Sequence, residues 1–68
     1  MPIIKIDMFS GRPEETKREL AQKLTETYID IVGGPASGVT ILFNEMEKSD
    51  WAVAGDLVSD RLAAKAKD

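Results

Sequence analysis

GRPEETKRELAQKLTETYIDIVGGP, residues 11–35, is the stretch that decides the fold of this chain. Pro13 suits the first turn of a helix, because the N–H that proline lacks would have no partner there. Glu14 and Glu15 complement the positive end of the helix dipole, and Gly33-Gly34-Pro35 ends the helix. Apolar side chains recur at i, i+4, i+8 and i+11, which is typical of one packed face. We therefore predict a helix over residues 14–32, with a packed face formed by Leu20, Ala21, Leu24, Tyr28 and Ile31.

A strand is predicted on each side of this helix. Residues 3–9, IIKIDMF, alternate apolar and charged side chains, as a strand with one buried face does. Residues 38–46, GVTILFNEM, place apolar groups on both faces, as expected for a strand that is covered on two sides. A strand, a helix and a strand in this order form a β-α-β unit with parallel strands and a right-handed crossover. We expect a single domain, residues 1–68, of the α/β (α+β) class.

The pattern is less regular after residue 46. Residues 47–50 read as a polar turn, residues 51–55 as a short hairpin or an extended arm, and residues 57–67 as a weak helix. Two strands and one helix leave the sheet edges and one sheet face uncovered. This arrangement favours association with another chain.

The size and composition of the chain also favour association. Ordering 68 residues costs roughly 100 kcal/mol, which burial in so small a chain about cancels. The sequence has no Cys and no His, so neither disulfides nor the common zinc ligand sets can stabilise the fold. Oligomerisation is the remaining source of stability, and we expect neither a metal nor a cofactor.

Charge and hydropathy exclude several classes of partner. The net charge is −3, and lysine and arginine are not clustered with aromatic residues, which argues against nucleic-acid binding. No apolar run approaches the length of a membrane span, and Asp7 interrupts the short apolar stretch at the start. We therefore expect a cytoplasmic protein that binds neither nucleic acid nor a membrane.

The terminal amine is the first candidate for proton transfer at neutral pH. Without His or Cys, no side chain has an ordinary pKa near neutrality, whereas an α-amino group has a pKa of roughly 7.7–8. Small residues after an initiator Met usually allow that Met to be removed. Removal of Met1 would leave the secondary amine of Pro2 at the start of the chain.

Three segments, MPIIKIDM, GRPEETKREL and FNEMEKSDWAVAGDL, resemble the 4-oxalocrotonate tautomerase family from Met1 to about Leu62. The resemblance implies a β-α-β protomer. In the family, two protomers form a dimer with a four-stranded sheet and helices on one face, and three dimers form a hexamer. Some relatives are hetero-hexamers, in which a second kind of chain supplies groups that the first lacks.

The resemblance also implies a reaction and a set of site residues. It implies a cofactor-independent tautomerase in which Pro2 is the general base for a small 2-hydroxy-dienoate or 2-oxo unsaturated carboxylate. Arg12 matches the family arginine that binds the substrate carboxylate, for which a guanidinium fork is well suited. Trp51 matches an aromatic position that walls the pocket between subunits. Read without the family, Pro2 would begin an edge strand, Arg12 would be a solvated loop residue and Trp51 would pack in an interface.

One departure from the family weakens the expected oxyanion stabilisation. Well-studied relatives carry a second arginine on the second strand, and Thr40 occupies that position here. The hydroxyl of Thr40 and the amide of Asn44 are the donors that this strand offers in its place. Loss of one oxyanion donor costs about 2.7–4 kcal/mol in a well-studied protease, so activity on 2-hydroxymuconate could be weak.

Two other functions stay open from the sequence. One is hydration or dehalogenation of a 3-haloacrylate, with protonated Pro2 as the acid and Glu45 or Asp50 activating water. The other is a catalytically weak structural subunit of a mixed hexamer, which the loss of the second arginine at Thr40 favours.

Overall fold

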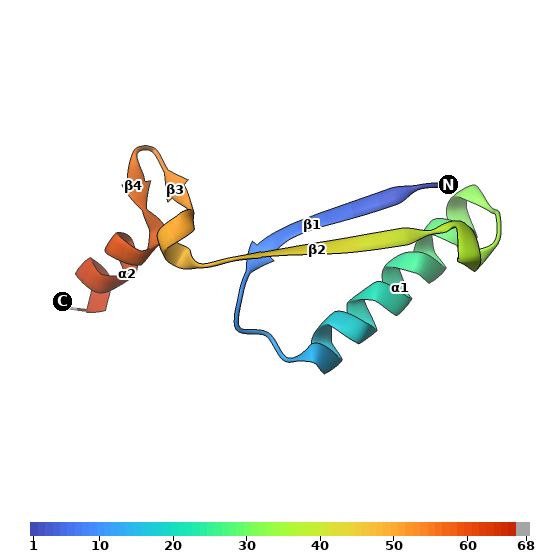
Figure 1. Cartoon of the computed structure of the whole chain (residues 1–68), viewed down its shortest axis with the longest axis horizontal. Helices are drawn as coiled ribbons and strands as arrows, with labels where there is room; N and C mark the ends of the chain where they lie inside the picture. The colour runs from blue at the N-terminus through green and yellow to red at the C-terminus, as the bar shows by residue number, and fades with distance from the viewer. Residues whose placement is uncertain (67–68) are drawn as a thin grey trace.

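The computed structural model describes residues 1–66 of the chain as a β-α-β unit followed by a short arm (Figure 1). Strand β1 runs over Ile3–Phe9, helix α1 over Glu14–Val32 and strand β2 over Thr40–Met46. The two strands are parallel, and α1 crosses one face of the sheet between them. The predicted class, the first strand and the helix bounds are confirmed.

Helix α1 begins and ends as its local sequence predicts. Pro13 caps it in an extended conformation, with φ at −67°. At the other end Gly33 adopts φ of 93° and donates its N–H to the carbonyl of Ile29 over 2.8 Å. This left-handed conformation favours glycine and stops the helix.

The packed face of α1 differs from the predicted face in one residue. Ile31 is 78% exposed, so its assignment to the packed face is wrong for the single chain. It lies in the last helical turn at the edge of the apolar stripe, where nothing in residues 1–66 covers it. The half-buried face instead includes Ile29, together with Leu20, Ala21, Leu24 and Tyr28.

Strand β2 is two residues shorter than predicted. Gly38 belongs to a 3₁₀ turn, η1 (Ala36–Gly38), and donates its N–H to Pro35. The N–H of Val39 donates to the carbonyl of Ala36 in the same turn, so it is not available for pairing with β1. Pairing begins at Thr40, opposite Ile3, and continues to Met46 opposite Phe9.

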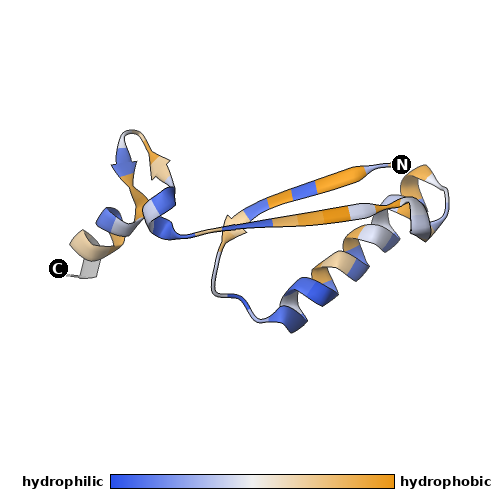
Figure 2. Cartoon of the chain, viewed as in Figure 1, coloured by the Kyte–Doolittle hydropathy of each residue, from blue (hydrophilic) through white to orange (hydrophobic). Residues whose placement is uncertain are grey.

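The two faces of the sheet have different surroundings. Side chains of Ile4, Ile6 and Met8 are half-buried, whereas Ile3, Lys5 and Asp7 are exposed. Alternation therefore places even positions of β1 and odd positions of β2 under α1. Figure 2 shows hydrophobic and hydrophilic residues along both strands. By the same alternation, the remaining open face carries apolar and polar groups together. Its exposed members on β1 and β2 are Ile3, Lys5, Asp7, Thr40, Leu42 and Asn44.

The arm after β2 contains a hairpin, which confirms one of the two predicted forms. A 3₁₀ turn, η2 (Lys48–Asp50), leads into antiparallel strands β3 (Ala52–Val53) and β4 (Asp56–Leu57). Ala54 and Gly55 join them, both with positive φ, as type I′ hairpin turns require. Helix α2 spans Val58–Ala66. Leu57, predicted to be helical, pairs in β4 instead, and Lys67 of the predicted helix lies outside the described residues.

The single chain is more extended than a compact domain of its length. Its radius of gyration is 16.2 Å, against about 11 Å for a compact domain of this length. Its accessible surface is 5279 Å², against about 4,200 Å² for a compact protein of this mass. No side chain in the described part of the chain is fully buried. The excess surface is similar to the ~800 Å² that one partner loses in a standard interface.

None of the helices within residues 1–66 has the length and apolar character needed to cross a membrane.

Candidate functional site

The predicted site residues lie at opposite ends of the sheet. Pro2 and Thr40 are at the end where both parallel strands begin, and Arg12 and Trp51 follow the end where they finish. Seven residue steps separate Pro2 from Phe9, which at about 3.3 Å per step is roughly 23 Å. Pro2 and Arg12 of one chain therefore cannot contact the same small substrate.

Pro2 lines a hollow of about 240 Å³ between the start of the sheet and the end of α1. Its carbonyl accepts the N–H of Thr40 over 3.0 Å, which fixes its backbone against β2. Met1, which precedes it, is 96% exposed. The hollow is lined by Met1, Pro2, Tyr28, Gly33, Gly34, Pro35, Gly38 and Val39.

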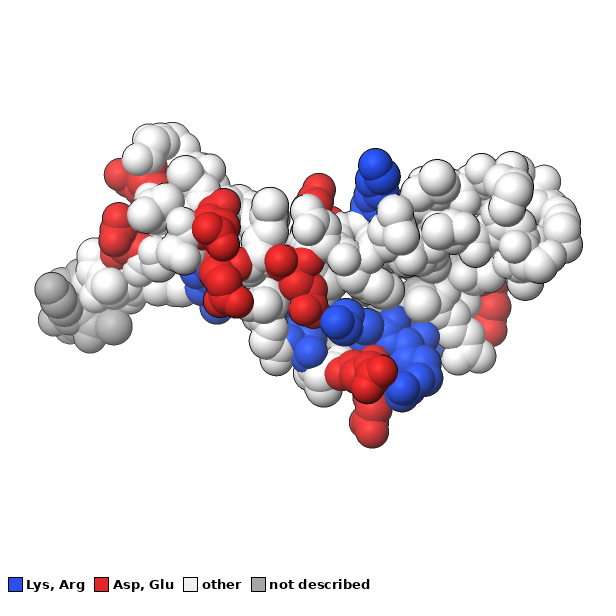
Figure 3. Space-filling model, in the orientation of Figure 1, with Lys and Arg blue, Asp and Glu red and all other residues white. Residues whose placement is uncertain are grey.

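This end of the molecule carries few charges. No Lys, Arg, Asp or Glu occurs from Ile31 to Phe43, nor from Met1 to Ile4. In Figure 3 the end that holds the N-terminus is accordingly almost free of blue and red. If a second chain covered this end, an amine at Pro2 would lose its contact with water. Its own chain would bring no charged side chain near it in exchange.

Thr40 is next to Pro2 across the two strands, but its side chain is on the other face of the sheet. Its side chain is exposed on the open face with Ile3 and Leu42. Val39 and Pro2 fall on the α1 side by the same alternation, and both line the hollow, whereas Thr40 does not. The structure therefore does not bring the Thr40 hydroxyl into the hollow that contains Pro2.

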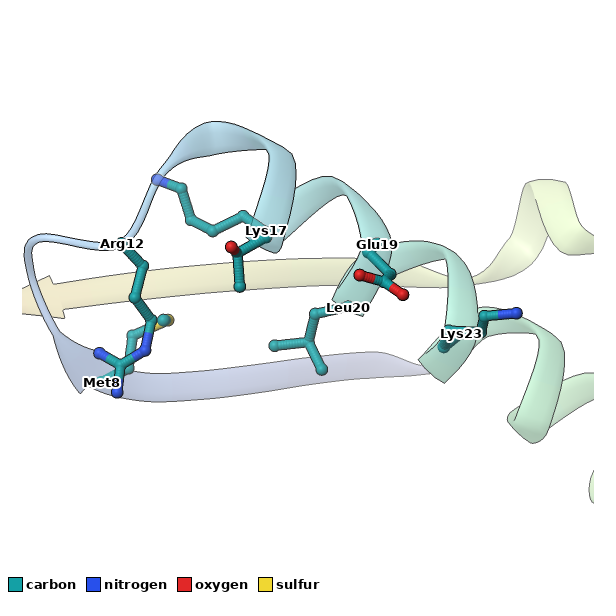
Figure 4. A pocket seen from close by; sticks show the side chains of 7 residues that line it. Met8, Arg12, Lys17, Glu19, Leu20 and Lys23 are labelled. Atoms are coloured by element: carbon teal, nitrogen blue, oxygen red, sulfur yellow. The ribbon is translucent and has the colours of Figure 1, made fainter.

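Arg12 lies at the far end of the sheet, beside a second hollow of about 310 Å³ between β1 and α1 (Figure 4). Its Nη1 donates to the carbonyl of Phe9 over 3.0 Å, which holds the side chain across the end of β1. Lys17, in the same hollow, pairs with Glu45 over 3.0 Å. Arg12 forms no ion pair within residues 1–66, so its remaining N–H groups can bind an anion.

Trp51 packs on Phe9 near this second end of the sheet. The two ring centroids are 4.4 Å apart at an interplanar angle of 49°. Lys48 places its Nζ 5.5 Å from the centroid of the Phe9 ring, so a cation and an indole both contact this one ring. Arg12, Lys48 and Trp51 therefore form a cationic and aromatic cluster around Phe9.

Asn44 is engaged within its own chain. Its Nδ2 donates to Oδ1 of Asp7 over 3.0 Å, in the cross-strand pair that the parallel register places side by side. It lies four residues along β2 from Thr40 and on the same open face. The structure therefore keeps Asn44 away from the Pro2 of its own chain.

The acidic candidates have mixed surroundings. Glu45 pairs with Lys17, as described above, so Lys17 competes with water for its carboxylate. Asp50 is exposed at the end of η2. In the part of the chain that the structure describes, no three His, Cys, Asp or Glu side chains gather closely enough to hold a metal ion.

Sequence reasoning missed two residues at these sites. The helical pattern predicts Tyr28 on the packed stripe of α1, and the structure shows that it also lines the Pro2 hollow. The available signal was a phenol on an otherwise aliphatic stripe, one turn before the helix ends. The sequence places Lys48 in a polar turn. No local pattern in it predicts that the Lys48 ammonium group lies near the Phe9 ring.

Comparison with known proteins gives consistent matches over nearly the whole chain. The family model described as tautomerase enzyme matches residues 2–61. The 2-hydroxymuconate tautomerase of Bacillus subtilis is 37% identical over 60 residues, which cover 88% of this chain and 97% of that protein.

Solved structures show the same fold. A 4-oxalocrotonate tautomerase isozyme from Methylibium petroleiphilum superposes with a TM-score of 0.88 at 33% identity, covering 93% of this chain and 98% of that one. A heterohexamer 4-oxalocrotonate tautomerase from Chloroflexus aurantiacus superposes with a TM-score of 0.81 at 28% identity, covering 88% and 97%. The resemblance seen in the sequence is thus confirmed in fold and family.

Proposed function

This chain belongs to the tautomerase family, and from that premise we propose that it is a cofactor-independent isomerase of small unsaturated carboxylates. Its substrates are 2-hydroxy-dienoates or 2-oxo unsaturated acids. Pro2, exposed by removal of Met1, is the general base. The observation that carries the proposal is the position of Pro2 in a hollow free of charged side chains, at the start of β1.

The reaction needs a base that is uncharged near neutral pH. Water exclusion disfavours the ammonium form of a secondary amine and lowers its pKa, and a nearby guanidinium acts in the same direction. The neutral amine removes a proton from the hydroxyl or from the carbon next to the carbonyl of the substrate. The electron pair moves through the conjugated system, and the prolinium returns the proton to a distant carbon.

The site is shared between chains in this proposal. Because Pro2 and Arg12 of one chain lie roughly 23 Å apart, the arginine that binds the substrate carboxylate comes from a neighbouring copy. Trp51 of that copy arrives with it, since both residues contact Phe9. The excess surface and the exposed apolar groups Ile3, Ile31, Val32 and Leu42 supply the interfaces. A hexamer built as a trimer of dimers with four-stranded sheets satisfies these requirements.

Hydration of a haloacrylate has less support than tautomerisation. That reaction needs a carboxylate that can activate water, and Glu45 is held by Lys17, which leaves Asp50, exposed at the end of η2, as the candidate. A catalytically weak subunit of a mixed hexamer stays the alternative, because the Chloroflexus relative forms a heterohexamer.

A direct assay tests the proposal. The chain that begins at Pro2 should ketonise 2-hydroxymuconate and phenylenolpyruvate, followed by the loss of dienol absorbance. Turnover of either substrate well above the buffer rate supports an isomerase. Absence of turnover on both substrates, in a chain shown by mass to begin at Pro2, would overturn it in favour of the structural subunit.

A further inference from the structure

Tyr28 is the only side chain with a hydrogen-bond donor among those that line the Pro2 hollow. The other lining residues are aliphatic, proline, methionine or glycine. Tyr28 is half-buried on α1, eight residues after Leu20 on the same stripe. Its hydroxyl makes no hydrogen bond to any group within residues 1–66. Because Tyr28 lines the hollow and its hydroxyl has no partner in this part of the chain, the hydroxyl can donate a hydrogen bond to a bound molecule.

The other donors expected from the sequence are less well placed in the same chain. Thr40 faces the open side of the sheet, and Asn44 donates to Asp7 on that side. The arginine that relatives carry is absent at position 40. Within one chain, Tyr28 on α1 is the residue that brings a side-chain donor to the lining of the same hollow as Pro2.

We propose that Tyr28 is a catalytic residue whose O–H donates a hydrogen bond to the substrate oxygen that becomes an enolate. The inference rests on the proposed function. When Pro2 takes the proton from carbon, the C–H electron pair becomes the enolate π-system and the charge collects on oxygen. The Tyr28 O–H stabilises that charge without giving up its proton. The prolinium then returns its proton to a distant carbon, and the carbonyl re-forms.

Tyr28→Phe tests the assignment, because it removes the hydroxyl and keeps the ring that packs on the sheet. We expect kcat to fall about 10²-fold, as for loss of one oxyanion donor, with KM changed by less than about threefold. The matched control is Thr27→Val on the same helix, which removes a hydroxyl that bonds only to the carbonyl of Lys23. Its kcat should stay at the parent value.

A second measurement separates a donor from a packing residue. Tyr28 is the only tyrosine in the sequence, so fluorotyrosine supplied to the chain changes this position alone. Fluorine makes the phenol more acidic while keeping its shape and its hydrogen-bonding group. The high-pH limb of the kcat profile should move to lower pH, since the donor is lost on ionisation. A packing role leaves that limb in place.

The outcomes distinguish this inference from the proposed function. If Pro2→Ala lowers kcat but Tyr28→Phe and fluorotyrosine leave it unchanged, Tyr28 is not the donor and the Pro2 mechanism survives. If the parent chain that begins at Pro2 turns over neither substrate, the proposed function itself is wrong, and if Pro2→Ala leaves kcat unchanged, Pro2 is not the required base. Circular dichroism and size-exclusion elution matching the parent show that each variant is folded and assembled.

Discussion

We expect a chain that keeps Met1 to lack the proposed turnover of 2-hydroxymuconate. The nitrogen of Pro2 is then an amide nitrogen, whose electron pair is delocalised into the carbonyl and accepts no proton. General-base catalysis contributes about 10²–10⁴ in rate, so the chain that begins at Met1 should fall below the chain that begins at Pro2 by that factor. The cause is local, because Met1 is 96% exposed and its presence changes little of the packing.

Chemical synthesis gives both forms without relying on an aminopeptidase, since the chain has 68 residues. The matched control is a chain that begins with alanine in place of Pro2, which keeps a free amine but replaces the secondary amine by a primary one. Equal kcat/KM for the chains that begin at Met1 and at Pro2 would remove the terminal amine from the mechanism.

Two impaired variants should restore activity when they are mixed. Pro2→Ala replaces the secondary-amine base by a primary amine, and Arg12→Ala lacks the carboxylate contact, worth about 1.5–3 kcal/mol or roughly 10–10²-fold in kcat/KM. If each site takes Pro2 from one chain and Arg12 from another, random exchange rebuilds about a quarter of the sites. The mixture should therefore reach about a quarter of the parent rate, well above either variant alone.

The geometry makes this prediction, because the strand between the two residues spans roughly 23 Å. Native mass spectrometry of isotope-labelled chains shows whether subunits have exchanged, and it reports the number of chains in the assembly. A mixture of Pro2→Ala with a Pro2→Ala, Arg12→Ala double variant is the matched control and should stay inactive. Arg18→Ala, at an arginine whose side chain is 66% exposed on α1, should keep the parent rate. Exchange without recovery would place both residues in the same site of one chain.

The fold was largely predictable because its signals are local. The bounds of α1 follow from Pro13, Glu14 and the glycine pair that begins at Gly33, and each of these acts within one turn. The start of β2 was placed two residues early, because Gly38 and Val39 donate to η1 rather than to the ladder. The exposure of Ile31 could not be predicted either, since periodicity reports which face a residue is on and not what covers that face.

The candidate site was less predictable because it depends on positions in space. Pro2, Arg12, Thr40 and Trp51 can be picked out by resemblance, but only the parallel register shows that they fall at two ends of one sheet. Tyr28 reaches the Pro2 hollow because α1 runs back along the strands. The helical pattern predicts which side of α1 is packed. It does not predict that the turn containing Tyr28 lies near the start of β1.

Two local effects act in opposite directions on the basicity of Pro2. Gly33 and Gly34 line its hollow at the carboxyl end of α1, and the last turn of that helix has no basic residue. The negative end of the helix dipole favours an ammonium group there by about 0.3–1 kcal/mol, which is less than about one pKa unit. Burial of a charged amine lowers its pKa by up to about 3–5 units. We therefore expect desolvation to outweigh the dipole if a second chain covers the hollow, as proposed.

The most direct test is a ¹⁵N NMR titration of Pro2 in the assembled chain that begins at this residue. The same chain in strong denaturant gives the reference titration of an exposed prolyl amine. Our account predicts that the pKa of the Pro2 amine in the assembly lies clearly below the reference, so that the amine is largely neutral at pH 7. A pKa equal to or above the reference would contradict the account, because the proposed base would then be protonated.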